Sequence, residues 1–533
     1  MPSLTANWTQ LLRLMLRRDR WWAIGWIIGV VVFCVFLTPL MPQMAGTPDK
    51  LTALAQMASN PALVAMCGVI YGGAASMGVL YSQMMIVWSG MLVATMSILV
   101  VVRHTAQEEE CGRLELITAT PTGRLASLTA AGVLMAAMNV AVALLTGCCM
   151  AAFNVASMDL RGSLVFGAAI GACGLLFGGL AMLVAQLVAS SRTVTTVCLS
   201  AMGLAYIWRA YGDLESEWVA RLSPLGLMQR TYPFEADRWW PVAVLAGGAL
   251  LLAALALRLA AGRDTNTGLI REPRERQRQA RWPDAQWGLI WQLTKVPVIA
   301  WAVTAFALSA GYGAVMDQMQ TFVSSNPLYQ QMMGIGAGEQ DIMGPVVVTL
   351  ILLMAMIAVA PILTTIYQLG AEEQAGRLDL VLSRPVARRR FFARLGGQAL
   401  IVAVLMQLAT AVGFWAVVTY ELPGVIAAHT IFGIALNYLA ALVAFGGLGL
   451  FLAGAAKRFT WVAWAYLVAS FLVVYLGGMV NLPAWVMKLS PFGLLPRWPS
   501  EPINWWAWAG LVVAGLVLAA LGSRGFRRRD VAS

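Results

Sequence analysis

The chain has 533 residues, of which 60% are hydrophobic and 11% charged, and its mean hydropathy is +0.74. These values exclude an ordinary soluble domain and indicate an integral membrane protein. The formal net charge of +11 comes from Lys and Arg beside apolar segments, which is typical of a membrane surface. We therefore expect contact with membrane lipid and no nucleic-acid partner.

Twelve apolar runs follow one another along the chain, each close to the roughly 20 residues that cross about 30 Å of hydrocarbon. Runs of this length and uniformity predict helices rather than barrel strands. The predicted fold class is therefore all-α integral membrane, with twelve transmembrane helices. They cover residues 21–40, 79–102, 126–153, 163–189, 194–210, 239–261, 297–316, 345–367, 395–420, 429–454, 460–479 and 503–522.

The distribution of basic residues predicts the orientation. Most Lys and Arg residues fall on the connections that share a face with the N-terminus. Lys and Arg are retained on the cytoplasmic side, so both termini are expected in the cytoplasm. Before the first span, residues 4–20 place apolar side chains on one helical face and predict a helix in the inner interface, with a weaker counterpart at Trp287–Lys295.

Two polar stretches share one pattern. Glu108–Arg124 has the sequence EEECGRLELITATPTGR and Glu372–Arg388 has EEQAGRLDLVLSRPVAR, 264 residues apart. Four further pairs of signatures recur at similar spacing, so the chain is a doubled sequence. The halves are 1–261 and 287–533, separated by a basic cytoplasmic linker, 262–286.

An even number of spans in each half gives the halves the same orientation. Six spans return the chain to the side from which it entered, so both halves enter from the cytoplasm. The repeats are therefore expected to be parallel, with a pseudo-twofold axis along the membrane normal.

The chain offers little chemistry of its own. The spans contain no charged residues except near their ends, as at Arg209 and Arg258, so a proton-coupled carrier would have little to titrate. No phosphate-binding P-loop occurs, and His104 and His429 fall on opposite faces of the membrane. The seven cysteines have neither disulfide nor zinc spacing. We expect no catalytic residue, metal site or bound cofactor.

Each repeated stretch combines a helical ion pair with apolar residues. Glu109 precedes Arg113 by four residues, as Glu373 precedes Arg377, and a proline then ends the helix. A short exposed helix of this kind, present twice about a twofold axis, suits docking on a twofold-symmetric partner. An ordinary solvated loop is the alternative.

The repeated stretch resembles the cytoplasmic motif of type-2 ATP-binding-cassette exporter permeases, in which Glu-x-x-x-Gly-(Thr/Arg)-Leu-Glu-Leu precedes Pro-x-x-Arg. The doubled chain is similar to the branch of exporters of polyketide antibiotics. The resemblance implies a bacterial cytoplasmic-membrane permease that pairs with two copies of a separately encoded ATPase, which would hold the ATP and magnesium.

In that family the motif lies in the coupling region between the second and third spans, here residues 104–125 and 368–394. The resemblance assigns ATPase coupling to Glu108, Glu109, Gly112, Arg113, Leu114, Glu115, Leu116 and Pro121, and to Glu372, Glu373, Gly376, Arg377, Leu378, Asp379, Leu380 and Pro385. Asp379 in place of Glu, and Ala387 in place of Gly123, imply that the two contacts are unequal.

The predicted function is ATP-driven export of an amphipathic drug, antibiotic or peptide through a cavity between the halves. Met and aromatic side chains adapt to bulky apolar ligands. The candidate lining residues are Met84, Met85, Trp88, Met91, Met202, Trp208, Met354, Met356 and Trp464. The alternatives are export of a lipid or polysaccharide, a secondary carrier, and a membrane scaffold that transports nothing.

Overall fold

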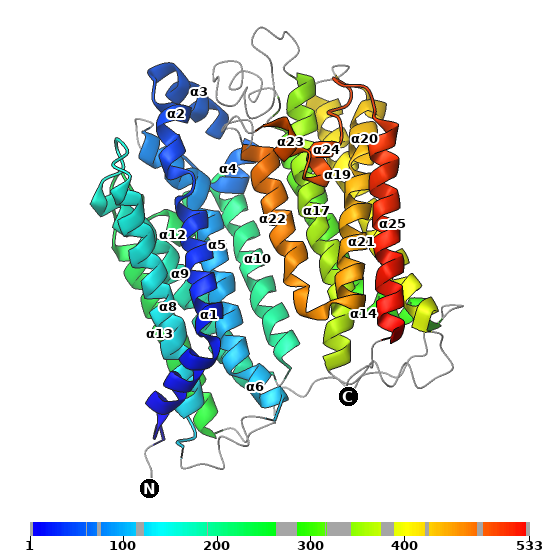
Figure 1. Ribbon diagram of the computed structural model, residues 1–533. Helices are drawn as coiled ribbons and strands as arrows, with labels where there is room; N and C mark the ends of the chain where they lie inside the picture. The colour runs from blue at the N-terminus through cyan, green and yellow to red at the C-terminus, as the bar shows by residue number, and fades with distance from the viewer. Residues whose placement is uncertain are drawn as a thin grey trace. The chain divides into compact units, whose positions relative to one another are not determined.

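A computed structural model describes most of the chain, and every regular element in the described residues is a helix. This confirms the all-helical prediction. The chain divides into two compact units, Met1–Arg276 and Gln277–Ser533, and Figure 1 shows the helices of each. The described residues are 4–59, 61–71, 76–112, 122–188, 190–262, 285–314, 316, 343–374, 388–421, 426–476 and 483–528.

The first unit is built from six long helices, of which α9 packs against α5, α8 and α13. Short helices fill the connection before α5 and the connection after α10, and one more, α6, follows α5. The long helices are α1 (Trp8–Val35), α5 (Met77–His104), α8 (Ala126–Ala152), α9 (Leu160–Leu187), α10 (Ser191–Glu215) and α13 (Trp240–Gly262). The short ones are η1 (Thr38–Leu40), α2 (Met41–Ala45), α3 (Pro48–Ala58), α4 (Pro61–Cys67), α6 (Ala106–Glu110), α11 (Glu217–Arg221) and α12 (Pro224–Gln229).

The second unit has its own bundle, in which α21 packs against α17 and α25, and α14 against α19. The predicted span 429–454 is divided into α20 and α21. The long helices are α14 (Ala285–Ala314), α17 (Met343–Gln374), α19 (Arg388–Glu421), α21 (Leu439–Ala455), α22 (Trp461–Leu476) and α25 (Trp505–Arg528). The others are α20 (Ala428–Asn437), η2 (Lys457–Phe459), α23 (Ala484–Met487) and α24 (Pro491–Leu494).

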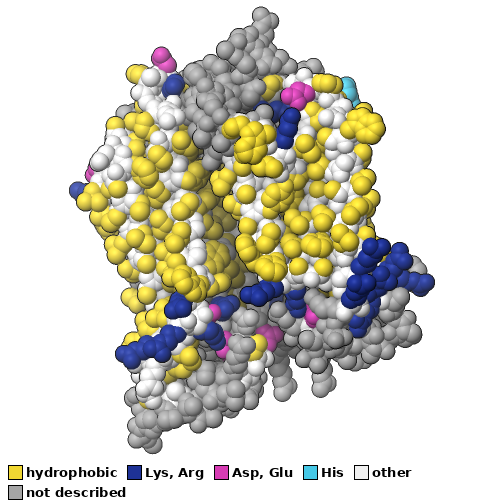
Figure 2. Space-filling view, in the orientation of Figure 1, with side chains coloured by type: hydrophobic (Ala, Val, Ile, Leu, Met, Phe, Trp, Pro, Cys, Tyr) yellow, Lys and Arg dark blue, Asp and Glu magenta, His cyan; other side chains and the backbone are white. Residues whose placement is uncertain are grey.

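Eleven helices in the described part of the chain are long and apolar enough to cross a membrane. The predicted span 194–210 lies in the remaining long helix, α10, whose apolar character is reduced by Arg209 and by Thr193, Thr195 and Thr196. Hydrophobic side chains cover the sides of the helices in both units, and Lys and Arg gather at helix ends (Figure 2). This surface is that of a multi-pass membrane protein.

The predicted interfacial helix at 4–20 is the first part of α1. The backbone of Asp19 leaves the helical region, with φ −112° and ψ 16°, and divides α1 into two segments. In the second unit α14 begins at Ala285 and therefore includes the weaker counterpart at 287–295.

Polar side chains within the spans bond to neighbouring segments of their own unit. The Gln83 amide donates to the carbonyl oxygens of Ala58 and Gly68 at 2.9 and 2.6 Å. The Gln407 amide donates to the carbonyl oxygen of Ala435 at 2.7 Å. Because no water can satisfy such groups in hydrocarbon, these contacts hold segments together.

Glycines bring the backbones of α21 and α25 into direct contact. A Cβ atom at Gly447 would lie 2.2 Å from the Gly515 carbonyl oxygen, and one at Gly454 would lie 2.2 Å from that of Gly522. Both helices thus place glycines seven residues apart on the shared face. These glycines therefore serve packing, because helices in lipid associate through close van der Waals contact.

We expect the Gly515→Leu variant to unfold at a lower temperature than the parent protein in detergent. The added side chain would meet the Val443 carbonyl oxygen, because a Cβ there lies 2.6 Å from it. Overpacking of this kind costs about 1–3 kcal/mol. The control is Gly510→Leu on the same helix, where a Cβ meets no atom within 4 Å. Equal unfolding temperatures for the two variants would contradict this account of the helix pair.

Candidate functional site

The first coupling region begins with a contact between its first glutamate and α1. The chain turns at Thr105, after α5, and Glu108 lies in the short helix α6 with only 7% of its surface exposed. Arg18 Nη2 lies 2.9 Å from the Glu108 carboxylate. The side chain predicted to meet a partner protein is therefore paired within its own unit, and it joins the coupling region to α1.

Asp19 lies at the centre of the ion pairs beside this contact. Its carboxylate is 2.6 Å from Arg103 Nη2 and 3.2 Å from Arg18 Nε, and the His104 ring lies 3.6 Å away. Asp19 is 6% exposed and sits at the kink of α1. Because Arg103 and His104 end α5, the network fastens the kink of α1 to the helix that leads into the coupling region.

A third glutamate of the region reaches the start of α10. The Glu110 carboxylate accepts hydrogen bonds from the Ser191 hydroxyl and from the Ser191 backbone N–H, the latter at 3.3 Å. Carboxylates are favoured at the N-terminus of a helix, where backbone N–H groups have no partner within the helix. The coupling region thus contacts two long helices, α1 through Glu108 and α10 through Glu110.

The last residues of the region pair with Leu4 and Ala6, near the start of the chain. The backbone N–H groups of Gly123 and Leu125 donate to the carbonyl oxygens of Ala6 and Leu4 at 2.9 and 2.8 Å. A Cβ atom at Gly123 would lie 2.3 Å from the Leu4 oxygen, so the close approach requires glycine. Ala387, the corresponding residue of the second repeat, lies outside the described residues.

The structure also explains the glycine of the motif in the first repeat. Gly112 has a φ of +69°, in the left-handed region that glycine adopts without strain. Its N–H donates to the Glu109 carbonyl oxygen at 3.0 Å, directly after α6 ends at Glu110. Glycine here ends the helix, as is common at helix C-termini.

The second coupling region begins within α17, which continues to Gln374 and contains Glu372 and Glu373. Glu373 is 8% exposed, and its carboxylate lies 3.1 Å from Nζ of Lys457, at the turn between α21 and α22. The Tyr367 hydroxyl donates to the Thr460 carbonyl oxygen at 3.1 Å. In both units, therefore, a glutamate of the repeated stretch contacts the segment that follows the fourth long helix. That helix is α9 in the first unit and α21 in the second.

Several assigned coupling residues lie outside the described residues, and their role stays a prediction. These are Arg113, Leu114, Glu115, Leu116 and Pro121 in the first repeat, and Gly376, Arg377, Leu378, Asp379, Leu380 and Pro385 in the second.

The predicted cavity residues lie on four helices, two in each unit. Trp88 faces α10, because its ring centroid lies 6.1 Å from that of Tyr206. The Trp208 side chain is 52% exposed, and its indole N–H donates to the Val219 carbonyl oxygen at 2.9 Å. Met85, Met202, Met354 and Met356 are buried within their own units, whereas Met84, Met91 and Trp464 are partly exposed. Their role as a shared lining stays a prediction.

The sequence does not predict one charged cluster, because Arg209 lies near the end of its predicted span. The side chains of Arg209 and Asp213 are fully buried and lie 3.2 Å apart, and Arg230 lies 3.0 Å from the other oxygen of Asp213. Arg209 also donates to the carbonyl oxygens of Ala65 and Met66 at the end of α4. The spacing of Arg209 and Asp213, four residues apart in α10, was the available signal.

The rim of this cluster is polar and contains both acidic and basic side chains. A pocket of about 330 Å³ beside Asp213 and Arg230 is also lined by Glu217, Tyr232 and Arg238. A hydrogen bond from Arg221 lowers the pKa of the Glu217 carboxyl, so that carboxylate is ionised at neutral pH. The cluster therefore joins α10 to the end of α12 through ion pairs, and to α4 through hydrogen bonds.

Comparisons with known proteins match nearly the whole chain. A family model described as "Multidrug efflux system permease Rv1217c, C-terminal domain" matches residues 9–259 and 285–527. The Multidrug efflux system permease protein Rv1217c of Mycobacterium tuberculosis (strain ATCC 25618 / H37Rv) is 31% identical over 541 residues, covering 98% of this chain and 94% of that protein. The matched ranges include the described parts of both coupling regions.

We expect Asp19→Asn to lower the free energy of unfolding, because it leaves Arg103 and Arg18 without the carboxylate between them. The loss should fall between the ~0.2–1 kcal/mol of exposed ion pairs and the ~3–5 kcal/mol of buried ones. Thermal unfolding in detergent measures it, with Asp49→Asn on the exposed surface of α3 as the control. If Asp19→Asn unfolds like that control, the network does not hold α1 to α5.

Proposed function

Because the chain belongs to the family of the multidrug efflux system permease Rv1217c, we propose that it is the membrane-spanning subunit of an ATP-driven exporter. It would pair with two copies of a separately encoded ATPase, which bind ATP and magnesium. The substrate would be an amphipathic drug, antibiotic or peptide. The observation that carries this proposal is the motif that occurs once in each half. In each half, a glutamate at the start of the motif forms an ion pair within its own unit.

The contacts of Glu108 and Glu110 support a coupling role for the first region. A segment that transmits force must be joined firmly to the helices that it moves. Glu108 is paired with α1, Glu110 with the start of α10, and Leu125 with the N-terminal segment. A push on the region would therefore reach α1, α5 and α10 together.

In the second unit the same role would fall to Glu373 and α17. Its partner Lys457 stands at the turn into α22, so a displacement of α17 would reach both α21 and α22. Closure of an ATPase dimer on binding ATP would draw the two regions together. The two units would then alternate between states that open to the cytoplasm and to the outside.

We include α10 among the spans, which gives six per half and the predicted twelve. Its 25 residues are long enough to cross the hydrocarbon. Arg209 and Asp213 stand in its last two turns, and their charges are paired within the protein. Each half would then begin and end in the cytoplasm, in agreement with the positive-inside rule.

The test that decides the class is gentle purification of the full chain from its native host. We expect an ATP-hydrolysing subunit to accompany it at about two copies per permease, with hydrolysis stimulated by an amphipathic drug. Isolation of the chain alone from several mild detergents would overturn the pairing and favour a secondary carrier or a scaffold.

We expect the double variant Glu115→Lys, Asp379→Lys to lose the ATPase subunit. Each substitution reverses the charge in the middle of a coupling motif, where a like charge on the partner repels rather than attracts. The amount of ATPase recovered with the tagged permease should fall about tenfold or more, the effect of roughly 1.4 kcal/mol. The control is Glu235→Lys, an exposed acid at the other end of the first unit. Full recovery with the double variant would refute the docking role.

Cysteine labelling tests the orientation. On a background without the seven native cysteines, Glu235→Cys and Glu501→Cys should react with a membrane-impermeant maleimide added to intact cells. Arg13→Cys and Arg524→Cys should react only after the cells are opened, because their segments are expected in the cytoplasm. All four side chains are exposed in the structure, so access depends on the membrane. The reverse pattern would invert the topology.

A further inference from the structure

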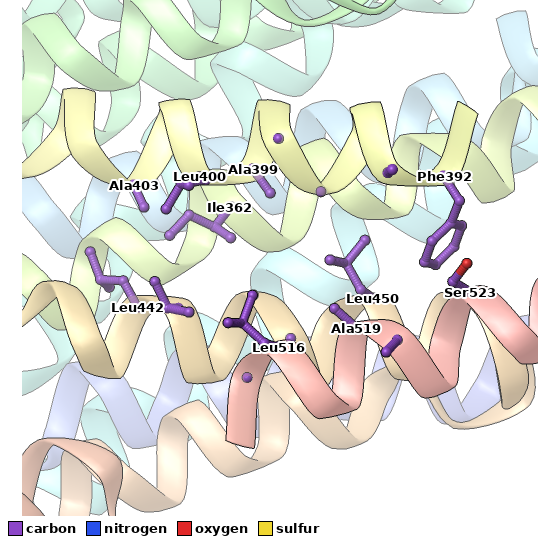
Figure 3. Close-up of a pocket in the computed structure, with 18 of the residues that line it drawn as sticks. Ile362, Phe392, Ala399, Leu400, Ala403, Leu442, Leu450, Leu516, Ala519 and Ser523 are labelled. Carbon is purple, nitrogen blue, oxygen red and sulfur yellow. The ribbon is translucent and has the colours of Figure 1, made fainter. Parts of the chain in front are cut away.

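An apolar pocket of about 350 Å³ lies in the second unit, between α19, α21 and α25 (Figure 3). Its walls are small or aliphatic side chains, among them Ala399 and Ala403 of α19 and Ala519 of α25. The volume falls within the ~300–1,000 Å³ of pockets that hold small molecules. The pocket therefore has room for an apolar ligand.

The pocket opens on the surface that faces lipid. Leu400 on one wall is 49% exposed and Leu516 on the other is 61% exposed. Gly446 and Gly447 of α21 line the pocket between them, and the absence of side chains at these positions gives the groove its depth. An acyl chain from the surrounding bilayer could therefore enter from the side.

One end of the pocket is polar, whereas the rest is apolar. Arg389 lines it one turn before Phe392 in α19, and Ser523 lines it from α25. Figure 3 shows Phe392 and Ser523 together at this end, with Ala403 and Leu442 at the other. From Arg389 to Ala403 the helix rises roughly 21 Å, which exceeds the roughly 15 Å of one hydrocarbon leaflet by about the depth of a headgroup.

The polar end is strongly basic. Arg388 and Arg390 flank Arg389, and Arg524 and Arg527 lie in the last turns of α25. The stretches 388–396 and 520–528 contain no acidic residue. Basic pockets between membrane helices on the cytoplasmic side suit the phosphate of an anionic lipid.

The internal repeat shows that this arrangement belongs to the second half. At the spacing of the coupling motifs, the position of Arg389 is Leu125 in the first half, and that of Gly397 is Val133. The first half thus has an apolar side chain in place of the cation, and a larger side chain in place of a glycine that lines the pocket.

We propose that the second unit binds one anionic phospholipid, with an acyl chain in this pocket and its phosphate at Arg389. The basic end attracts the negative headgroup and would repel a cationic amphiphile. The site is independent of the proposed transport activity, because it needs only the permease in its membrane.

The test measures lipid retained by the full-length permease after mild delipidation, by native mass spectrometry, with phosphatidylglycerol and phosphatidylcholine of the same chains. The parent protein should retain one phosphatidylglycerol in preference to phosphatidylcholine. Arg389→Leu introduces the residue found at the corresponding position of the first half, Leu125. It should lower phosphatidylglycerol retention roughly five-fold, the contribution of one cation near the membrane surface. Arg390→Leu, an exposed neighbour that does not line the pocket, should retain it.

A second pair of variants tests the acyl chain. Ala519→Phe would fill the pocket and should abolish retention, whereas Ala514→Phe, on an exposed face of the same helix, should not. Equal retention by Arg389→Leu and the parent would overturn the proposal. So would retention by Ala519→Phe, or equal retention of the two phospholipids by the parent protein.

Discussion

Each unit depends on small residues that let the backbones of neighbouring helices approach closely. Lipid tails are as apolar as the helix surfaces, so burial of apolar area does not drive helices together within the bilayer. In the second unit Gly447 and Gly515 bring α21 and α25 into backbone contact. In the first, Gly167 approaches the Ala143 backbone in the same manner, and a Cβ there would lie 2.2 Å from its carbonyl oxygen. The tight pairs fix the long helices, and the polar networks are formed at their ends.

Those networks place charged side chains at the ends of the helices, where the boundary between hydrocarbon and water is expected. Asp19 joins α1 to α5 at one end of the first unit, and Asp213 joins α10 to α12 at the other. Each carboxylate lies between two arginines, so neither carboxylate is buried alone, which would be costly. The Asp19 contacts hold the end of α5 to the kink of α1, so these two helices are joined at that end of the unit.

The sequence predicted the elements better than the contacts between them. Periodic apolar runs are long enough to identify helices individually, and the coupling motif was recognisable because it occurs twice. The Asp19 network was missed because Asp19 and Arg103 are 84 residues apart, and nothing local indicates that they meet. The apolar pocket was missed for the same reason, since it depends on how α19 and α25 flank the glycines of α21. The predicted span 194–210 lies in a continuous helix, α10, as the sequence predicted, although Arg209 reduces its apolar character.

The pairing of Leu4 and Ala6 with Gly123 and Leu125 bears on how the protein is made. The two partners of this contact emerge from the ribosome within the first quarter of the chain, long before the second unit is synthesised. The cytoplasmic end of the first unit can therefore be completed during translation, without its counterpart. It also makes Leu4 and Ala6 part of a folded element beside Gly123 and Leu125.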